Sequence, residues 1–235
     1  MTDSDPAALK RAAALKALDF VENGMKLGLG TGSTAEAFLD LLATRMRGGL
    51  SITGVATSER TAQKARALSI PLAELDGQAP LDLTIDGTDE ADRDLNLIKG
   101  GGGALLREKI VATSSKRMVV IADESKLVAK LGRFPLPVEV ATFGHATTAA
   151  RITNAVAKLK YRNVPMTLRM KDDAPLKTDG GNYIYDCGFG AIADVPALAQ
   201  AISDIPGVVE HGLFVGIATA LVIARADGVE VIEKK

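Results

Sequence analysis

Acidic side chains, one lysine and a run of glycines stand close together near the middle of the 235-residue chain. Asp86 and Asp89 lie in an Asp-Gly-Thr-Asp segment, and Lys99 directly precedes the glycines at 100–103. A carboxylate can take or return a proton, an ammonium group can stabilise developing negative charge, and glycine amides can approach an anion closely. Together these features predict acid–base chemistry on a small anionic substrate.

The glycine run stands where a loop passes into a helix. Residues 103–111 resume a helical pattern, and the first N–H groups of a helix lack partners within it, so they can bind an anion. Glu108 lies one to two turns into this helix, within reach of a substrate held between the loops. The alternative for such a residue is an ordinary exposed glutamate.

A second glycine loop, at 28–35, joins a predicted strand at 25–29 to a predicted helix. Thr31, Ser33 and Thr34 add hydroxyl groups to the start of that helix, and this combination favours a phosphate. The structural alternative is a tight turn in which Ser33 caps the helix.

The same loop satisfies a loose dinucleotide-binding pattern. Gly30, Gly32 and Ala35 have the G-x-G-x-x-A spacing, and Glu59 lies at a suitable distance downstream. No Gly-Lys-Ser/Thr follows, which excludes a P-loop. From the residues alone, a nicotinamide-dependent oxidoreductase is therefore an open alternative.

Two more lysines bear on the same site. Lys126 follows an apolar strand predicted at 117–122, and the carboxyl ends of parallel strands gather on one edge of a sheet. Lys10 lies on the first predicted helix, which begins after Asp5-Pro6 and ends at Asn23-Gly24. For Lys10 we expect a solvated surface position.

The acidic loop, residues 86–92, is compatible with two other chemistries. An aspartyl phosphatase of the haloacid dehalogenase class needs an aspartate at the position of Thr84, so we reject that reading. A Mg²⁺ or Mn²⁺ site built from Asp86, Asp89 and Asp92 stays open, although neither histidine of the chain has metal-ligand spacing. We expect Glu90 and Asp92 to be solvated loop acids.

Alternating strands and helices must position these loops. Strands of the first part are predicted at 25–29, 51–56, 70–75, 81–85 and 117–122. Their alternation with helices predicts an α/β fold, with a Rossmann-like, mostly parallel sheet covered by helices on both faces.

After residue 131 the pattern changes to β-α-β-β-α, which predicts a smaller inserted α+β (ferredoxin-like) domain at 132–205. The strands predicted at 208–214 and beyond return to the main sheet or its edge. Residues 1–131 and 206–235 are thus expected to form the α/β catalytic domain.

Composition excludes several classes of protein. Hydrophobic residues make up 47% of the chain and charged residues 24%, as in ordinary globular domains. A formal net charge of −1 gives no reason to expect nucleic acid as a partner, and no apolar run is long enough to suggest a membrane partner. The N-terminus lacks a signal-peptide pattern and Cys187 is the single cysteine, so we expect a cytoplasmic location.

The motifs together resemble type A ribose-5-phosphate isomerase, over nearly the whole chain. The segments that carry the resemblance are Gly30-Thr-Gly-Ser-Thr-Ala35, Asp86-Gly-Thr-Asp-Glu90, Lys99-Gly-Gly-Gly-Gly103 with Glu108, Asp123-Glu-Ser-Lys126, Thr178-Asp-Gly-Gly-Asn-Tyr183 and Ile205-Pro-Gly-Val-Val-Glu-His-Gly-Leu-Phe214. His145 departs from the family, which often has tryptophan there, but it falls in the inserted domain.

The resemblance implies interconversion of D-ribose 5-phosphate and D-ribulose 5-phosphate through an enediolate, in the non-oxidative pentose phosphate pathway. It implies that Glu108 is the base, that Asp86 and Asp89 assist ring opening and proton transfer at O1 and O2, and that Lys99 stabilises negative charge. Their division of labour stays open, as does the choice of the loop and lysine that hold the phosphate.

The resemblance also implies a set of substrate-binding residues. They are Thr31, Gly32, Ser33, Thr34, Asp86, Gly87, Thr88, Asp89, Lys99, Gly100, Gly101, Gly102 and Lys126. It implies no cofactor and no metal, a sugar phosphate as the small-molecule partner, and a homodimer or homotetramer.

A non-catalytic sugar-phosphate sensor is the second alternative, because effector domains of some sugar-responsive repressors share this architecture. Such a protein should carry a helix-turn-helix segment. The first predicted helix of this chain has no partner helix for one.

Overall fold

Capping side chains mark the starts of three helices in the computed structural model, which describes residues 5–234. The helices are α1 (Pro6–Ala17), α2 (Ser33–Arg47), α3 (Glu59–Ala67), α4 (Leu105–Thr113), α5 (His145–Lys158) and α6 (Val195–Ser203), with 3-10 turns η1 (Leu18–Phe20) and η2 (Glu124–Lys126). Asp5, Ser58 and Asp194 accept hydrogen bonds from first-turn N–H groups of α1, α3 and α6. Within residues 5–234, none of the helices is both long enough and apolar enough to cross a bilayer.

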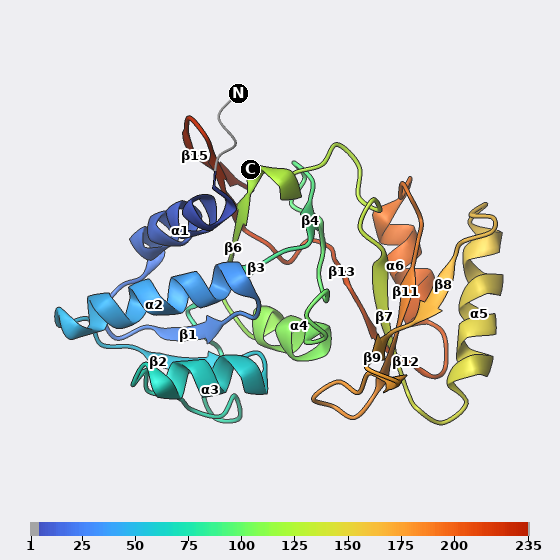
Figure 1. Ribbon diagram of the computed structural model, residues 1–235, viewed down its shortest axis with the longest axis horizontal. Coiled ribbons are helices and arrows are strands. Elements are labelled where there is room, and N and C mark those ends of the chain that lie inside the picture. The colour runs from blue at the N-terminus through green and yellow to red at the C-terminus, as the bar shows by residue number, and fades with distance from the viewer. Residues whose placement is uncertain (1–4, 235) are drawn as a thin grey trace.

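The chain forms two units, each built on its own sheet. Six strands form the central sheet of the first unit, in the order β15-β14-β6-β3-β1-β2 (Figure 1). Their bounds are β1 (Lys26–Leu29), β2 (Thr53–Ala56), β3 (Leu83–Gly87), β6 (Met118–Asp123), β14 (Ala220–Arg225) and β15 (Gly228–Glu233). All neighbouring pairs are parallel except β14 with β15. The predicted α/β fold with a mostly parallel sheet is confirmed.

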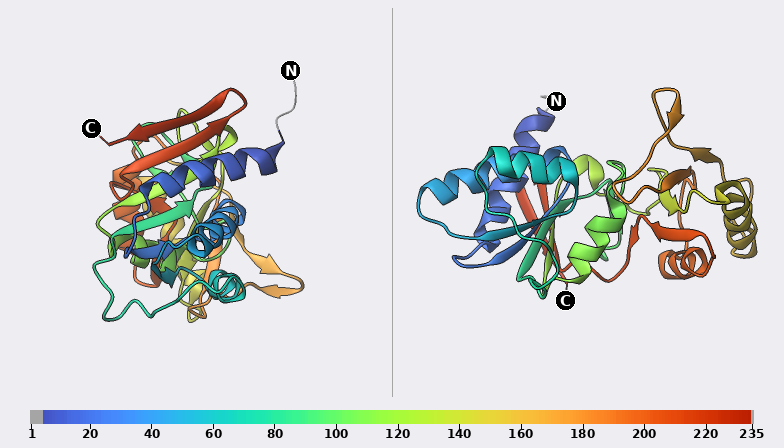
Figure 2. Two further views of the ribbon diagram at one scale, coloured as in Figure 1. Left: turned by 90° about the vertical axis from the view of Figure 1, so that its left-hand side faces the viewer. Right: turned by 90° about the horizontal axis from the view of Figure 1, so that it is seen from below.

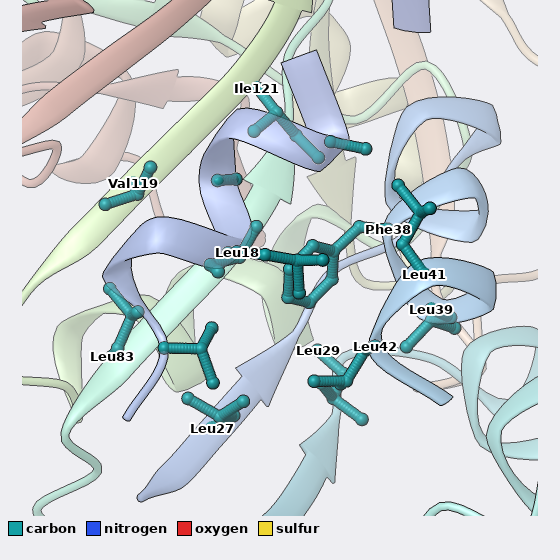
Figure 3. Packing of buried hydrophobic residues seen from close by; sticks show 14 of the residues in the cluster. Leu18, Leu27, Leu29, Phe38, Leu39, Leu41, Leu42, Leu83, Val119 and Ile121 are labelled. Carbon is teal, nitrogen blue, oxygen red and sulfur yellow. The ribbon is translucent and has the colours of Figure 1, made fainter. Parts of the chain in front are cut away.

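Both faces of this sheet are covered by other elements. Alternate residues of each strand point to opposite sides, so each strand contributes side chains to both faces. Leu83 packs with Phe38 and the other side chains that α1 and α2 bring to one face (Figure 3), and Ile85 belongs to the same cluster. Met118 and Val120 belong to a second cluster on the opposite face. That cluster includes side chains of α4 and of a small three-stranded sheet, made of β4 (Glu90–Ala91), β5 (Leu97–Ile98) and β13 (Leu213–Phe214).

The strand predicted at 70–75 does not form, so that prediction is wrong. Leu72 makes only an isolated parallel bridge to Gly54. Pro71, next to it, has no N–H to donate, so the segment cannot continue a regular ladder of hydrogen bonds.

The second unit is an antiparallel sheet with two helices, coloured yellow to orange at one side of the first unit (Figures 1 and 2). Its strand order is β12-β7-β11-β8, with bounds β7 (Leu136–Val140), β8 (Met166–Leu168), β11 (Tyr183–Cys187) and β12 (Val208–His211), and β9 (Met170–Lys171) pairs separately with β10 (Ala174–Pro175). Ile152 of α5 and Leu198 of α6 pack with Val138 and Cys187 of the sheet. The order β-α-β-β-α-β along the chain is the ferredoxin-like arrangement that the sequence predicted.

One predicted return to the main sheet is wrong. Within 208–214, β12 pairs with β7 of the second sheet, where Val208 lies opposite Val140, and β13 pairs with β5. Gly212 separates these two strands, and a Cβ there would lie 2.2 Å from the carbonyl oxygen of Lys99. The absence of a side chain at Gly212 therefore lets the chain pass against the glycine loop at 100–103 before β14 and β15 rejoin the central sheet.

Candidate active site

The carboxyl ends of β1, β3 and β6 bring the predicted loops to one edge of the central sheet. The residues that line the cleft at this edge are Lys10, Thr31, Gly32, Ser33, Thr34, Gly87, Thr88, Asp89, Lys99, Gly100, Gly102, Glu108 and Lys126. Two predicted site residues, Asp86 and Gly101, are not part of this lining. They contact residues that are, since Asp86 pairs with Lys99 and Gly101 donates to Asp89.

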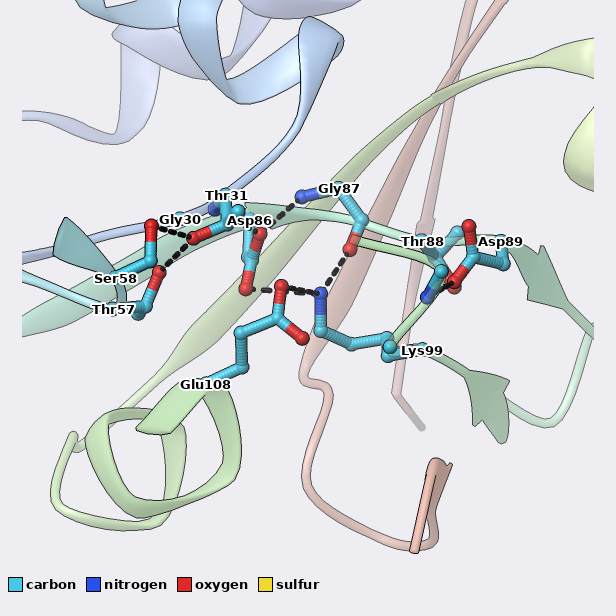
Figure 4. A network of polar contacts seen from close by, with 12 residues as sticks. Gly30, Thr31, Thr57, Ser58, Asp86, Gly87, Thr88, Asp89, Lys99 and Glu108 are labelled. Carbon is cyan, nitrogen blue, oxygen red and sulfur yellow. Dashed lines mark hydrogen bonds and ion pairs between the residues drawn. The ribbon is translucent and has the colours of Figure 1, made fainter. Parts of the chain in front are cut away.

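Lys99 lies at the centre of a buried ion cluster (Figure 4). Its Nζ lies 2.9 Å from Asp86 Oδ2 and 3.2 Å from Glu108 Oε1, and it donates to the carbonyl oxygen of Gly87 at 2.6 Å. Glu108 is only 4% exposed, so the alternative of an exposed helical glutamate is wrong. Its other oxygen, Oε2, has no hydrogen-bond partner within residues 5–234. The carboxylate of Glu108, a residue of the cleft lining, is thus not saturated by hydrogen bonds from the described part of the chain.

Burial and mutual attraction shift the protonation of this cluster. Burial raises the pKa of Glu108 to about 8, against the opposing effect of Lys99 and with the help of Asp86. Burial also raises the pKa of Asp86, although Lys99 opposes this. For Lys99 burial acts to lower the pKa, but the attraction of the two carboxylates outweighs it and the pKa is raised. A carboxyl group whose pKa lies near neutrality can both take and return a proton.

Backbone N–H groups fix the orientation of Asp86. Its Oδ1 accepts hydrogen bonds from the N–H of Thr31 at 3.0 Å and of Gly87 at 2.7 Å. A Cβ on residue 30 would lie 2.2 Å from the same oxygen, so Gly30 is needed for this close contact. The glycine that matched a dinucleotide pattern therefore has a structural reason that involves no nicotinamide.

Asp89 has a different environment from Asp86. It is half-buried at the cleft, and its Oδ2 accepts a hydrogen bond from the N–H of Gly101 at 2.7 Å. The neighbouring Thr88 donates through Oγ1 towards the carbonyl oxygens of Glu90 and Ile98, at 2.6 and 3.0 Å. These contacts hold the acidic loop against the glycine loop.

The N-terminus of α2 is open for an anion. Its N-cap is Gly32, with φ of +107°, and no side chain caps the helix. Ser33 is the first helical residue, so the alternative of a serine cap is wrong. The first-turn N–H groups therefore face the cleft without a capping side chain, next to the hydroxyl groups of Ser33 and Thr34.

Lys10 belongs to this end of the cleft, contrary to the expectation of a solvated surface lysine. Its Nζ donates to Ser33 Oγ at 2.9 Å, and its side chain lines the cleft with Lys126. Lys10 lies on α1 outside any motif, and only the packing of α1 beside α2 brings it here. The sequence contains no local signal for this role.

A buried group of hydroxyls behind Thr31 was also not predicted. Thr31 Oγ1 lies 2.8 Å from the hydroxyl oxygens of Thr57 and Ser58 and 3.1 Å from that of Thr61. Thr57 and Thr61 in turn donate to the carbonyl oxygens of Leu29 and Gly30. The group ties the loop after β1 to the start of α3 and so fixes Thr31 beside Asp86.

Glu90 is not a solvated loop acid, and that prediction is wrong. Its side chain is 1% exposed and accepts hydrogen bonds from the N–H groups of Gly132 and Phe134, both at 2.7 Å. It therefore fixes the segment that leads into the second unit.

Asp92 does not join the candidate metal site. Its carboxylate, partly buried, accepts hydrogen bonds from the backbone of Asp94 and from Asn96 in its own turn. Within residues 5–234, no three His, Cys, Asp or Glu side chains are grouped to hold a metal ion. The structure thus gives no support to the open alternative of a site built with Asp86 and Asp89.

Comparison with known proteins agrees with this geometry. Residues 53–228 match the family model described as ribose 5-phosphate isomerase A (phosphoriboisomerase A). The ribose-5-phosphate isomerase A of Nitrobacter hamburgensis is 54% identical over 228 residues, which cover 97% of this chain and 98% of that protein. The one from Parvibaculum lavamentivorans is 55% identical over 225 residues, or 95% and 97% of the two chains.

Solved structures give the same result. The ribose 5-phosphate isomerase from Plasmodium falciparum has a TM-score of 0.92 at 39% identity, covering 97% of this chain and 99% of that one. A D-ribose-5-phosphate isomerase solved in complex with phospho-erythronic acid has a TM-score of 0.90 at 38% identity, with the same coverage.

Proposed function

The chain belongs to the ribose 5-phosphate isomerase A family, and on that premise we propose how its cleft performs the reaction. The protein is an aldose–ketose isomerase that interconverts D-ribose 5-phosphate and D-ribulose 5-phosphate, a step of the non-oxidative pentose phosphate pathway. The observation that carries the proposal is that the Glu108 carboxyl group is buried beside Lys99, with its Oε2 unpaired among the described residues.

Glu108 carries the proton between the two carbons. Its carboxylate takes the proton from C2 of the open-chain aldose, the C2–H electron pair forms the C1–C2 double bond, and the aldehyde oxygen becomes negatively charged. The resulting enediolate takes the proton back at C1, while the proton of O2 is transferred to O1, so that O2 becomes the ketone oxygen and O1 a hydroxyl group. One group can serve as both base and acid because its pKa is raised to about 8.

Lys99, Asp86 and Asp89 support this transfer. The Lys99 ammonium stabilises the negative charge that develops on O1 and O2, since a buried cation acts strongly where water is excluded. Asp86 and Asp89 assist ring opening and the transfer of hydroxyl protons. Asp89, half-buried at the cleft, is placed to meet the substrate hydroxyls, while Asp86 keeps Lys99 charged and oriented.

The phosphate binds at the N-terminus of α2. Free N–H groups, the hydroxyls of Ser33 and Thr34, and the ammonium groups of Lys10 and Lys126 surround this position. The glycine loop is less suited to the phosphate, because its Gly101 N–H is already engaged by Asp89. The sugar then extends from α2 towards Lys99 and Glu108, between the acidic and glycine loops.

Replacement of the proposed base tests this assignment. Glu108→Gln keeps the shape of the side chain but cannot accept the proton, so kcat should fall by about 10²–10⁴-fold. Binding of a non-reacting sugar phosphate, measured by calorimetry, should stay within a few-fold of wild type. Near wild-type turnover by Glu108→Gln would sink the proposal.

The wider organisation is part of the proposal. The α/β part, residues 1–131 and 206–235, supplies the catalytic groups, and the inserted part at 132–205 supports them, with β12 crossing between the two. Cytoplasmic location is supported by the presence of a single cysteine, Cys187. Burial raises the pKa of Cys187 to about 12, so the side chain stays an unreactive thiol. Assembly into a homodimer or homotetramer is proposed from the family alone, and Phe143, which is 95% exposed in the monomer, is an aromatic residue available to such an interface.

A further inference from the structure

Arg169 reaches from the second unit to the glycine loop of the first. It follows β8, and its Nη1 donates to the carbonyl oxygen of Gly100 at 2.8 Å and towards that of Gly101 at 3.3 Å. Its side chain is 14% exposed and is not part of the cleft lining. Arg169 therefore acts on the loop from behind and has no direct access to the substrate.

The same peptide unit is bound on both of its sides. The carbonyl of Gly100 and the N–H of Gly101 belong to one planar trans peptide group, and they point in opposite directions. The carbonyl oxygen contacts the Arg169 guanidinium, while the N–H donates to Asp89 Oδ2 at 2.7 Å. A cation on the carbonyl also polarises the peptide group and strengthens the N–H as a donor.

The next peptide unit is aligned in the same sense. Because the carbonyl of Gly101 faces Arg169, the N–H of Gly102 faces the opposite side, where Gly102 lines the cleft. Glycines have wide conformational freedom, and Gly100 has a φ of +106°. Without an external contact, these peptide units could rotate and turn carbonyl oxygens towards the substrate.

Asp186 fixes the guanidinium itself. Nε and Nη2 of Arg169 form a two-pronged ion pair with the carboxylate of Asp186 on β11, where Nε lies 2.9 Å from Oδ2. Arg169 N also donates to the carbonyl oxygen of Ile184 on the same strand. Both the backbone and the side chain of Arg169 are thus anchored to the second sheet, and only a guanidinium has enough donors for both tasks.

We propose that Arg169 is a positioning residue of the isomerase, which holds the Gly100–Gly102 peptide groups so that their N–H groups face Asp89 and the substrate. This rests on the proposed function of the cleft. It gives the inserted unit a part in catalysis, because one of its side chains sets the geometry of a loop that the other unit carries.

Removal of the guanidinium tests the proposal. Arg169→Ala should lower kcat/KM by about 10–100-fold, since small displacements of positioning groups are costly. Guanidinium ion at millimolar concentration should restore part of the lost rate, whereas urea at the same concentration should not. Asp186→Asn, which keeps the guanidinium but loosens it, should give a smaller loss. Arg151→Ala, on exposed α5 of the same unit, is the matched control and should match wild type.

Amide hydrogen exchange gives a readout that does not depend on turnover. In wild-type protein the Gly101 amide should be protected, and in Arg169→Ala it should exchange at least about 10-fold faster, with β6 amides unchanged. Unchanged Gly101 protection, or a loss of rate that guanidinium ion does not relieve in a folded variant, would overturn the inference. Altered exchange together with a wild-type protein that does not isomerise the substrate would instead refute the proposed function alone.

Discussion

At the scale of single residues, the contacts that a side chain makes in the folded chain, rather than its residue type, separate the functional side chains from ordinary ones. Glu108 and Lys109 are neighbours on α4, yet Glu108 faces Lys99 while Lys109 binds Glu210 and the carbonyl oxygen of His211. Motif order identifies Glu108 from the sequence, whereas Lys10 carries no signal, because α1 and α2 meet only in the folded chain. Glu90 shows the converse, an acid in a motif that is used for structure.

The raised pKa of Glu108 predicts the pH dependence of the reaction. The base must be ionised, and burial moves its pKa from the ordinary range to about 8. Hence kcat/KM should be low at pH 6, rise with pH and level off above about 8. A profile measured with ribose 5-phosphate that is flat between pH 6 and 9 would show that Glu108 is already ionised throughout.

Lys10 should contribute to phosphate binding rather than to the proton transfer. We expect Lys10→Met to raise KM by about 10-fold or more with kcat changed little, because a charge-assisted contact to the phosphate is lost. Lys16→Met is the matched control, since Lys16 lies on the same helix and pairs with Asp19 in solvent. A fall in kcat at unchanged KM would place Lys10 in the chemical step instead.

At the scale of elements, parallel strands explain why separate weak motifs form one site. The loops after β1, β3 and β6 must meet at one edge, so the location of the site was predictable from the strand pattern alone. The absence of a regular strand at 70–75 and the path of β12 were harder to predict. Pro71 interrupts an otherwise suitable run, and β12 chooses between two sheets by tertiary pairing that no local pattern encodes.

Gly30 should tolerate no side chain, because it determines how closely β1 approaches Asp86. In Gly30→Ala the added Cβ would meet the Asp86 carboxylate at 2.2 Å, displacing it from Lys99. Activity should fall at least about 10²-fold while circular dichroism stays that of a folded protein. Gly48→Ala, at the end of α2 and away from the cleft, is the control. Equal effects of the two changes on the rate would contradict this role of Gly30.

At the scale of the whole molecule, two units with separate cores share one site. The first contributes the reacting groups, and the second fixes the glycine loop at 100–103 through Arg169. Glu210 lies on β12, which crosses between the two units, and it binds Lys109 next to Glu108. The change in the pattern of predicted strands and helices along the sequence predicted two units and their fold classes. It could not show the contacts between them, because those join residues far apart in the chain whose pairing depends on how the two sheets pack.

The exposed Phe143 predicts an interface between copies of the chain. Its ring is 95% exposed in the turn between β7 and α5, and aromatic residues are enriched at interfaces between proteins. Light scattering of the wild type should give at least a dimer, and Phe143→Asp should shift it towards the monomer. Lys158→Asp, at the other end of α5, should leave the mass unchanged. A monomeric wild type would contradict the proposed assembly.

Proton NMR of ribose 5-phosphate in D₂O, with wild-type protein and with Glu108→Gln, each with and without EDTA, tests directly whether Glu108 moves the proton. If it does, and if no metal takes part, the wild type forms ribulose 5-phosphate with deuterium at the carbon that receives the proton, at a rate unaffected by EDTA. With Glu108→Gln, both deuterium incorporation and product formation should slow by about 10²–10⁴-fold. Deuterium exchange by Glu108→Gln at the wild-type rate would contradict the assignment of Glu108 as the base, and loss of exchange with EDTA would move the acidic loop into a metal site.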